Sequence, residues 1–370
     1  MNLSYWEYKT WLSNVDFTIV GSGIVGLSCA LRLHERFPKA KILILEKGFL
    51  PQGASTKNAG FACFGSISEI IDDLRSHSEE QVQQLVKMRW YGIQLLRKTL
   101  ADSNIDYQRW GGHEIFLDKD DLLYNECLEK LESVNKLLYP IFKANPFFEK
   151  KNIFNFNKVK DYYISHKFEG QIDTGKMMQA LLRQVQKNKV ILLNSVEVEE
   201  FAENGTNITV KTNLFEFKTK KLIVATNGFA EKLLNESIKP ARAQVLLTKP
   251  IENLKVAGTF HFERGYYYFR NIDNRILIGG GRNLDFKAEE TTEFGLSDLV
   301  QNRLEGLLRD IILPNIPFEI ESRWSGIMGT GQEKQPIVKQ LSNNVYCGVR
   351  LGGMGIAIGS LVGKEVADLV

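Results

Sequence analysis

The chain has 370 residues, of which 44% are hydrophobic and 11% aromatic, so it can bury a large core and should form roughly two domains. Its formal net charge of +3 is small and its lysines are spread along the chain, which excludes the charge pattern expected for nucleic acid or an anionic membrane. Cys29, Cys63, Cys127 and Cys347 show no CxxC spacing and no paired histidines nearby, so we expect neither a disulfide framework nor a metal site.

The N-terminal region offers no targeting signal. Residues 1–14 lack an apolar core of signal-peptide length, and no window reaches the uninterrupted apolar length of a membrane span. We therefore expect a reduced, cytoplasmic protein without a membrane span. The sequence leaves open the oligomeric state and whether the natural chain extends past Val370.

The most informative segment of the chain is 15–47. A short apolar stretch leads into the loop Gly21-Ser-Gly-Ile-Val-Gly26, which is followed by an amphipathic helix to about Phe37 and a second strand over 41–45. Glu46 ends this strand, 20 positions beyond Gly26. This order describes a βαβ unit with the glycine loop and the acidic residue of a dinucleotide-binding fingerprint.

Each residue of this fingerprint has a physical role. Gly21 allows a tight turn, Gly23 lets backbone N–H groups approach a pyrophosphate, and Gly26 lets helix and strand pack closely. Glu46 would accept hydrogen bonds from an adenosine ribose. NAD and FAD both place their adenosine halves on such a unit, so the fingerprint permits either. The predicted binding set also includes Ile24 and Lys47.

Further elements follow from the spacing of apolar residues. Helical spacing predicts helices over 82–100, 119–139, 175–187 and 296–311, the third of them capped at Asp173-Thr174. Short strands are predicted over 190–193, 196–201, 208–212, 215–217 and 222–225. From residue 240 the period changes to two, which indicates antiparallel strands over 244–248, 266–270 and 276–279.

Seven segments of the chain follow one another as family landmarks. They are GSGIVG with Glu46, ASTKNAG (54–60), KLIVATNG (221–228), PARAQVLLT (240–248), YYYFRNIDNRILIGGGR (266–282), RWSGIMGTGQEKQPIV (323–338) and NVYCGVRLGGMGIAIGSLVG (344–363). In these segments the chain resembles the FAD-dependent D-amino-acid oxidase superfamily. Within it, the chain is most similar to the amine-oxidising branch that includes gamma-glutamylputrescine oxidase, sarcosine oxidase and glycine oxidase.

The resemblance implies an α/β fold with two domains. A Rossmann-like FAD-binding domain would be assembled from 1–90, 170–240 and 320–370. A second, α+β substrate domain built on an antiparallel sheet would comprise 91–169 and 241–319. FAD would lie extended through the first domain, with its flavin ring at the junction, where ligands commonly bind.

The resemblance also implies which residues touch the cofactor. A small-residue turn exposes backbone N–H groups and Lys57 adds positive charge, although a plain surface loop is the alternative. Val196 would meet adenine, and the turn after 222–225 would touch the cofactor from its other side. The matching residues are Ala54, Ser55, Thr56, Lys57, Asn58, Gly60, Val196, Ala225, Thr226 and Gly228.

The closing block is rich in glycine and would meet the flavin. Gly353, Met354 and Gly355 match the family's turn at the flavin pyrimidine edge. This turn opens a helix whose N-terminal dipole would stabilise negative charge on the reduced ring. Close packing of helix against sheet is the alternative reason for the glycines, and both reasons can hold together.

Three departures from the family concern flavin attachment and the substrate. Segment 324–330 contains no cysteine, where sarcosine oxidase attaches its flavin, so we expect noncovalent FAD. Met328 stands in the place of the carboxylate-binding arginine of glycine oxidase. Leu277 and Gly355 replace two lysines of sarcosine oxidase, one of which assists oxygen and the other the substrate carboxylate. These departures argue against a simple free α-amino acid as the substrate and against efficient use of oxygen as the electron acceptor.

The remaining substrate candidates are aromatic and cationic. Alternation along 266–270 places Tyr266, Tyr268 and Arg270 on one face of a strand, and we expect this face to line the cavity under the flavin. The alternative is that these residues serve only sheet packing or structural ion pairs. Trp324 and Arg350 complete the predicted substrate-binding set.

The function implied is oxidation of the C–N bond of a small-molecule amine or amino-acid derivative, by hydride transfer to flavin and hydrolysis of the imine. Oxygen is the family's usual electron acceptor, with hydrogen peroxide as product, and a quinone or carrier fits as well. No obligatory acid or base is needed. His77, His113, His166 and His261 show no catalytic spacing with an acid and a serine, so a hydrolase has little support. A noncatalytic FAD-binding assembly module and an NAD-linked dehydrogenase are the alternatives, and a nucleic-acid substrate is disfavoured.

Overall fold

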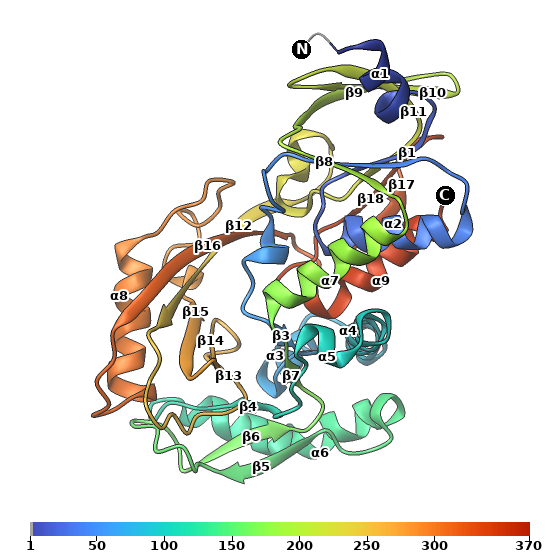
Figure 1. Cartoon of the computed structure of the whole chain (residues 1–370). Coiled ribbons are helices and arrows are strands. Elements are labelled where there is room, and N and C mark those ends of the chain that lie inside the picture. The colour runs from blue at the N-terminus through green and yellow to red at the C-terminus, as the bar shows by residue number, and fades with distance from the viewer. Residues whose placement is uncertain (1–2) are drawn as a thin grey trace.

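The computed structural model describes residues 3–370. Figure 1 shows a first sheet that contains β1, β11 and β18, and a second sheet that contains β12 to β16. The helices are α1 (Tyr5–Glu7), α2 (Ile24–Arg36), α3 (Ile67–Asp73), α4 (Glu79–Leu100), α5 (Asp102–Ile105), α6 (Asp121–Phe142), α7 (Thr174–Lys187), α8 (Asp298–Leu307) and α9 (Gly355–Asp368). None of the helices within 3–370 is long and apolar enough to cross a membrane.

The strands are interspersed with these helices in the first half of the chain, and β8 to β15 then follow one another in succession. They are β1 (Val15–Val20), β2 (Ile42–Glu46), β3 (Phe61–Ala62), β4 (Gly112–Glu114), β5 (Phe147–Lys151), β6 (Tyr162–His166), β7 (Gly170–Gln171), β8 (Ile191–Asn194), β9 (Val198–Asn204), β10 (Asn207–Thr212), β11 (Glu216–Val224), β12 (Lys239–Thr248), β13 (Thr259–Phe262), β14 (Tyr267–Ile272), β15 (Arg275–Gly280), β16 (Ile320–Thr330), β17 (Ile337–Gln340) and β18 (Val345–Val349).

The first sheet has the order β17-β18-β11-β1-β2-β8, and β10 and β9 extend from β11. Strands β18, β11, β1, β2 and β8 run parallel. In the register, Val20 pairs with both Leu45 and Val224. The carboxyl ends of three strands therefore meet at one edge of the sheet, which is where parallel sheets bind ligands.

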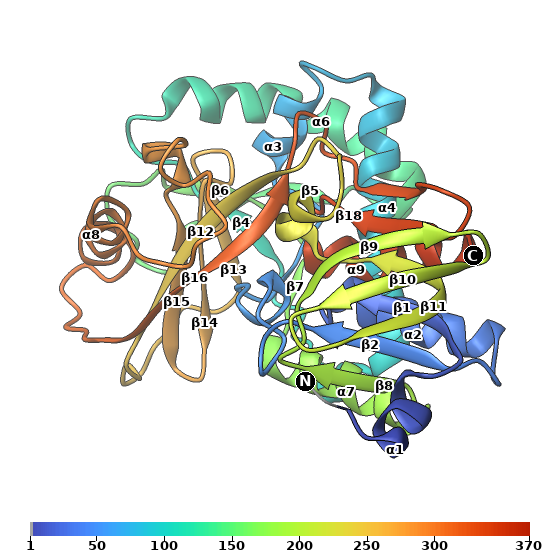
Figure 2. The same cartoon turned by 90° about the horizontal axis from the view of Figure 1, so that it is seen from above.

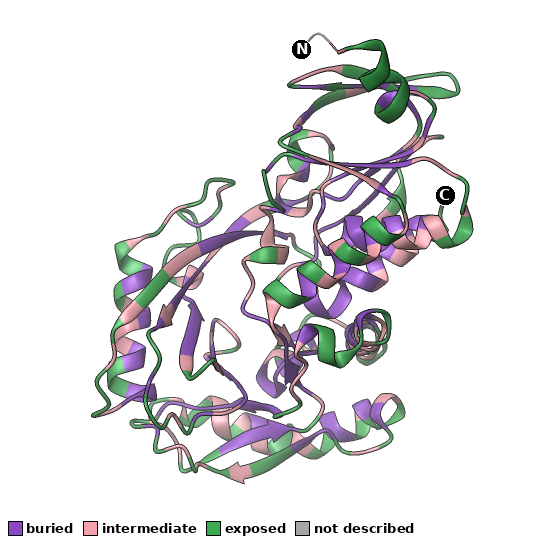
Figure 3. Ribbon diagram, in the orientation of Figure 1, coloured by how far each residue is buried: buried purple, intermediate pink, exposed green. Residues whose placement is uncertain are grey.

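Both faces of the first sheet are covered, as its continuous apolar strands require. Ile42 and Ile44 of β2 pack into a core with α2, α7, α9 and part of α4. Leu43 and Leu45 point the other way, into a core with β9, β10 and β11. Figure 3 shows buried residues in the strands of both sheets and exposed residues on the outer sides of α7 and α8.

The second sheet has the order β16-β12-β15-β14-β13-β4-β6-β5, and its pairs are antiparallel except β13 with β4. Tyr267 and Phe269 pack with α8 in a core on one face. Tyr268 and Leu277 lie on the opposite face, packed with Ala59 of the segment that follows β2. The alternation is therefore as predicted over 267–270, whereas Tyr266 precedes β14 and packs against the core that holds Tyr267. Figure 2 shows α8 on the side of this sheet that is turned away from the first sheet.

The predicted helices and most predicted strands occur within a few residues of their expected positions. Asp173 caps α7, because its side chain accepts a hydrogen bond from the Lys176 N–H at 2.8 Å. The prediction of separate strands over 215–217 and 222–225 is wrong. The structure has one strand, β11, whose first part pairs with β10 while its second part pairs with β1 and β18. A polar, lysine-rich middle concealed this continuity.

The proposed domain boundaries fall at two places where elements are continuous. Residue 90 lies within α4, and the boundary between residues 240 and 241 lies within β12, which pairs with β16 along its length. Gly92 of α4 packs closely on α9, since a Cβ there would lie 1.9 Å from the Ala357 carbonyl oxygen. The division into a cofactor domain and a substrate domain stays a prediction.

Candidate active site

The glycine loop lies at the carboxyl edge of the first sheet, between β1 and α2. Gly21 has a φ of +103°, which residues with a side chain rarely adopt, and its N–H donates to the Leu45 carbonyl at 2.8 Å. A Cβ at Gly26 would lie 2.0 Å from the Gly21 carbonyl oxygen. The loop is therefore folded tightly, as the sequence predicts, and presents the positive end of α2 to the space beyond it.

Glu46 ends β2 and is buried beside this loop. One oxygen of its carboxylate accepts hydrogen bonds from the Ser22 N–H at 3.0 Å and the Ser22 hydroxyl at 2.7 Å. The other oxygen accepts one from the Gly48 N–H at 3.0 Å. These bonds fix the side chain, and a carboxylate has acceptor capacity beyond three bonds, so the group can still receive a ribose hydroxyl.

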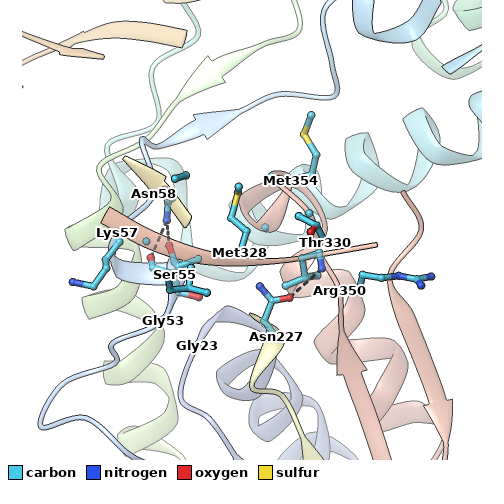
Figure 4. Close-up of a pocket in the computed structure, with 18 of the residues that line it drawn as sticks. Gly23, Gly53, Ser55, Lys57, Asn58, Asn227, Met328, Thr330, Arg350 and Met354 are labelled. Carbon is cyan, nitrogen blue, oxygen red and sulfur yellow. Dashed lines mark hydrogen bonds between the residues drawn. The ribbon is translucent and has the colours of Figure 1, made fainter. Parts of the chain in front are cut away.

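The turn 54–60 is pinned to two helices. Ser55 Oγ accepts a hydrogen bond from the Ile24 N–H at the start of α2, at 3.0 Å. Asn58 Nδ2 donates to the carbonyls of Ala54 and Ser55, and its Oδ1 accepts from the Thr174 hydroxyl of α7 at 2.8 Å. Figure 4 shows Ser55 and Asn58 with these bonds. The turn lines a cavity, and the role of its residues in binding a cofactor stays a prediction.

The start of α9 opens on the same cavity. Asn227 Oδ1 accepts a hydrogen bond from the Leu351 N–H at 3.1 Å, which holds the turn before the helix (Figure 4). A Cβ at Gly355 would meet nothing within 4 Å. At Gly359 and Gly363, by contrast, a Cβ would lie 2.7 Å and 2.5 Å from atoms of α2. Close packing therefore explains Gly359 and Gly363, while the role of Gly355 at the flavin stays a prediction.

One cavity of about 1160 Å³ joins these parts to the second sheet. Three residues of the predicted cofactor set do not line it; two of them are buried behind its wall, and Thr56 is exposed to solvent. They are Gly26, Thr56, whose hydroxyl donates to the Pro51 carbonyl, and Gly228, which packs on the Met328 carbonyl. The other predicted residues all line it: Gly21, Gly23, Ile24, Glu46, Lys47, Ala54, Ser55, Lys57, Asn58, Gly60, Val196, Ala225, Thr226, Gly353, Met354 and Gly355.

The predicted substrate residues divide into two groups. Tyr266 and Tyr268 line the cavity. Arg270 does not: it is buried against the backbone of Gly60, where a Cβ would lie 2.7 Å from its guanidinium, and burial lowers the pKa of Arg270 to about 10. Trp324 also stays behind the wall and donates its Nε1–H to the Lys57 carbonyl at 3.0 Å. These two residues shape the turn 54–60.

Arg350 lines the cavity but is held by its neighbours. Its Nε donates to the Gln335 carbonyl at 3.1 Å, and its guanidinium contacts Glu333 at 3.2 Å. In Figure 4 its side chain points away from Met328 and Met354. A substrate group would have to compete with these partners for Arg350.

Sequence reasoning missed a cluster of buried polar residues around Cys63. Arg89 of α4 lines the cavity and donates to the Phe64 carbonyl at 2.9 Å. His261 of β13 also lines it, and its Nε2 lies 2.7 Å from Glu169 Oε1. Glu169 and His261 are 92 positions apart, so no local sequence motif indicates that they pair.

Cys63, Glu169 and His261 offer three atoms within 4.8 Å of one another, as a metal site would. Burial and then the charges of Glu169 and Glu69 raise the pKa of the Cys63 thiol well above its usual value. Metal ions bind the thiolate, so a thiol kept protonated is a poor ligand. The Glu169 carboxylate is moreover already paired with histidine. The cluster is better explained as an ion pair than as a metal centre.

The residues present fit FAD. The positive end of α2, with Lys57 nearby, suits a pyrophosphate, and Glu46 suits the adenosine ribose. The start of α9 supplies a second helix N-terminus, and Gly355 leaves open space there. The cavity is also large enough for a dinucleotide with a second small molecule.

Comparisons with known proteins agree with this site. The family model described as FAD dependent oxidoreductase matches residues 16–369, and the chain belongs to this family. The chain is 25% identical to gamma-glutamylputrescine oxidoreductase of Escherichia coli (strain K12) over 381 residues, covering 96% of this chain and 83% of that protein.

Solved structures share the fold. Glycine oxidase from Bacillus cereus ATCC 14579 superposes with a TM-score of 0.76 at 17% identity, covering 96% of each chain. L-proline dehydrogenase from P. horikoshii superposes with a TM-score of 0.74 at 18% identity, covering 96% of this chain and 93% of that one. The predicted superfamily, the α/β fold class and the FAD cofactor are confirmed. Of the two cofactors that the fingerprint permits, the cofactor is therefore FAD and not NAD.

Proposed function

We propose that this FAD-dependent oxidoreductase oxidises the C–N bond of a small amine or amino-acid derivative. One observation carries the proposal: a single cavity runs from the glycine loop and Glu46 to Tyr266 and to the face of the second sheet that bears Tyr268. A cofactor at one end and a substrate at the other would share one cavity. The names of gamma-glutamylputrescine oxidoreductase and glycine oxidase support an amine as the substrate class.

When bound, FAD supplies a flavin that accepts a hydride from the substrate carbon. The protein's own part is to hold the substrate carbon toward the flavin and to keep water out. Phe61 supports this wall, because its ring packs edge-on against Tyr268 with centroids 5.4 Å apart. We expect the FAD to be held noncovalently, since Cys347 is buried away from the cavity and the thiol of Cys63 is kept protonated.

The lining favours a substrate other than a simple free α-amino acid. Met328 and Gly355 line the cavity where related enzymes carry a cation for the carboxylate. Leu277 is buried against Ala59 and Val245. An amine with an apolar or extended body would fit this wall better. Oxygen, giving hydrogen peroxide, is the proposed electron acceptor, and we propose a cytoplasmic location.

The test is a visible spectrum of the purified protein followed by addition of secondary amines, polyamine conjugates and amino acids without oxygen. We expect flavin absorbance that one compound class bleaches within seconds, and reoxidation when oxygen is admitted. Met328→Arg is a matched variant, because it restores a cation to the wall and should shift preference toward free amino acids. A flavoprotein that no compound bleaches would contradict the proposal and favour a noncatalytic FAD-binding role.

A further inference from the structure

His261 is placed to face a molecule in the cavity. It lies on β13 directly opposite Tyr268 of β14, on the same face of the second sheet, and it lines the cavity. Its Nε2 is 2.7 Å from Glu169 Oε1, so this nitrogen carries the proton that is donated to the carboxylate. Nδ1 is then the ring nitrogen left for a ligand. Phe61 packs edge-on against the ring, with centroids 5.2 Å apart, and limits its rotation.

Glu169 is a fully buried carboxylate with two histidine neighbours. It lies between β6 and β7 and has 0% of its surface exposed. Its second oxygen is 2.6 Å from His166 Nε2. Gly112 of β4 makes room for it, because a Cβ there would lie 2.1 Å from Glu169 Oε2. A buried charge persists only when it is compensated, and here two imidazoles supply the compensation.

The surroundings favour a charged pair. Burial opposes protonation of His261, but the charge and hydrogen bond of Glu169 outweigh it and raise the pKa of His261 to about 9. Burial also opposes ionisation of Glu169, yet the two histidines hold the pKa of Glu169 well below its usual range. Glu69 of α3 and Glu114 of β4 add negative charge toward His261, and the other ionisable groups of this region include Tyr268, His113, His166, Cys63 and Arg89.

We propose that His261, oriented by Glu169, takes the proton from the substrate's ammonium group in this cavity. This inference rests on the proposed function, because it requires an amine substrate. In the step, which requires the neutral form of His261 with Nδ1 unprotonated, the ammonium N–H bond breaks, its electron pair stays on nitrogen, and the proton bonds to Nδ1 of His261. The resulting imidazolium is stabilised by Glu169. The neutral amine thereby gains the lone pair that its oxidation to an imine requires.

Two further observations support this assignment. An ordinary histidine, with a pKa of about 6.5, is too weak a base to take a proton readily from an alkylammonium group with a pKa of about 10. Pairing with Glu169 raises the pKa of His261 and so reduces the difference between the two pKa values. Among the cavity-lining residues within 3–370, His261 is the one histidine. A pair that served only to stabilise the fold would not need to place His261 in the cavity wall.

The experiment compares wild type, His261→Gln, Glu169→Gln and the control His77→Gln, whose residue lies outside the cavity. The first readout is the NMR titration of the imidazole C–H signals in the FAD-loaded protein without substrate. The chain has five histidines, so the signal missing from His261→Gln identifies His261. We expect a pKa of about 9 in wild type and His77→Gln. Glu169→Gln should return it toward about 6.5.

The second readout is the rate of flavin bleaching by the amine, without oxygen, as a function of pH. Wild type should speed up as pH rises toward 9, because deprotonated His261 is the acceptor. In His261→Gln the rise with pH should move toward the ammonium group's own pKa of about 10 and the rate should fall by about 10²–10⁴-fold, while in Glu169→Gln the rise should move to lower pH. Should His261→Gln fail to retain FAD, Glu169→Gln decides alone, since it keeps the imidazole.

The inference and the proposed function fail in different ways. A wild-type His261 that titrates near its ordinary value, or a His261→Gln protein that keeps the rate and the pH dependence of wild type, would overturn the role of His261 while amine oxidation stands. If no amine bleaches the wild-type flavin, amine oxidation itself is contradicted, and the proton-transfer step falls with it.

Discussion

The two ends of the cavity are formed by different parts of the chain: backbone groups at one end and side chains at the other. The end at the first sheet is made of backbone: glycine turns, two helix N-termini and one fixed carboxylate, Glu46. The end at the second sheet is made of side chains, such as Tyr268 and His261, that come from separate strands. Backbone geometry demands particular residues at fixed spacing, whereas a wall of side chains can be assembled from many positions. The first end should therefore tolerate less change than the second.

The largest effect is expected at Gly26. In Gly26→Ala the new methyl carbon would lie 2.0 Å from the Gly21 carbonyl oxygen, so the loop must move away from α2. We expect loss of bound FAD, because overpacking costs about 1–3 kcal/mol or more at a site that needs its exact shape. The ratio of flavin to protein absorbance measures this.

Gly306→Ala is the matched control for Gly26→Ala. A Cβ at this position of α8 would meet nothing within 4 Å. The control should keep all its FAD and unfold at a slightly higher temperature, since alanine favours the helix by about 0.5–1 kcal/mol. Full FAD occupancy in Gly26→Ala would contradict the view that the cofactor end depends on tight backbone packing.

A smaller effect is expected at Glu46. Glu46→Gln keeps the shape but weakens the bonds to Ser22 and Gly48 and to a ribose. Hydrogen bonds to charged groups are worth about 1.5–3 kcal/mol, so FAD affinity should fall by about 10–100-fold, as measured by titrating the flavin-free protein with FAD. Glu200→Gln, on exposed β9, should leave the affinity unchanged. If wild type, Glu46→Gln and Glu200→Gln bound FAD with equal affinity, the adenosine could not be bound at Glu46.

How much of the site could be predicted from the sequence also differs between the two ends of the cavity. The glycine loop, Glu46 and the turn 54–60 could be located because each motif sits within a few consecutive residues. The pair of Glu169 and His261 could not, because only the pairing of β13 with β4 and of β4 with β6 brings these distant residues together. Arg270 was misplaced for another reason. Strand alternation gives its face correctly, but the turn at Gly60 covers it.

At the substrate end, Tyr268→Phe and Tyr267→Phe form a matched pair on opposite faces of β14. Tyr268→Phe should alter the KM for the amine by about 2–10-fold through one lost hydrogen bond and leave FAD binding intact. Tyr267→Phe should change thermal stability only, because its ring packs against α8. Steady-state kinetics with both variants checks this, and equal changes in KM would remove the distinction between the two faces.

The smallest effect is expected where the two helices hold the turn 54–60. Thr174→Val removes the hydroxyl that donates to Asn58 Oδ1 at 2.8 Å, while Asn58 keeps its bond from the Gly60 N–H. We expect a loss of about 0.5–1.5 kcal/mol in the free energy of unfolding, measured by urea denaturation. Thr10→Val, at an exposed position, is the control. A loss above that range would mean that the whole turn had come free.

The most direct measurement is a crystal structure of the FAD-loaded protein with an unreactive amine bound. The account predicts the adenosine ribose at Glu46, the flavin between the start of α9 and the second sheet, and the amine nitrogen within hydrogen-bond distance of His261 Nδ1. An amine seated outside the cavity, or a cofactor turned with its adenosine toward Tyr268, would contradict the assignment of the two ends.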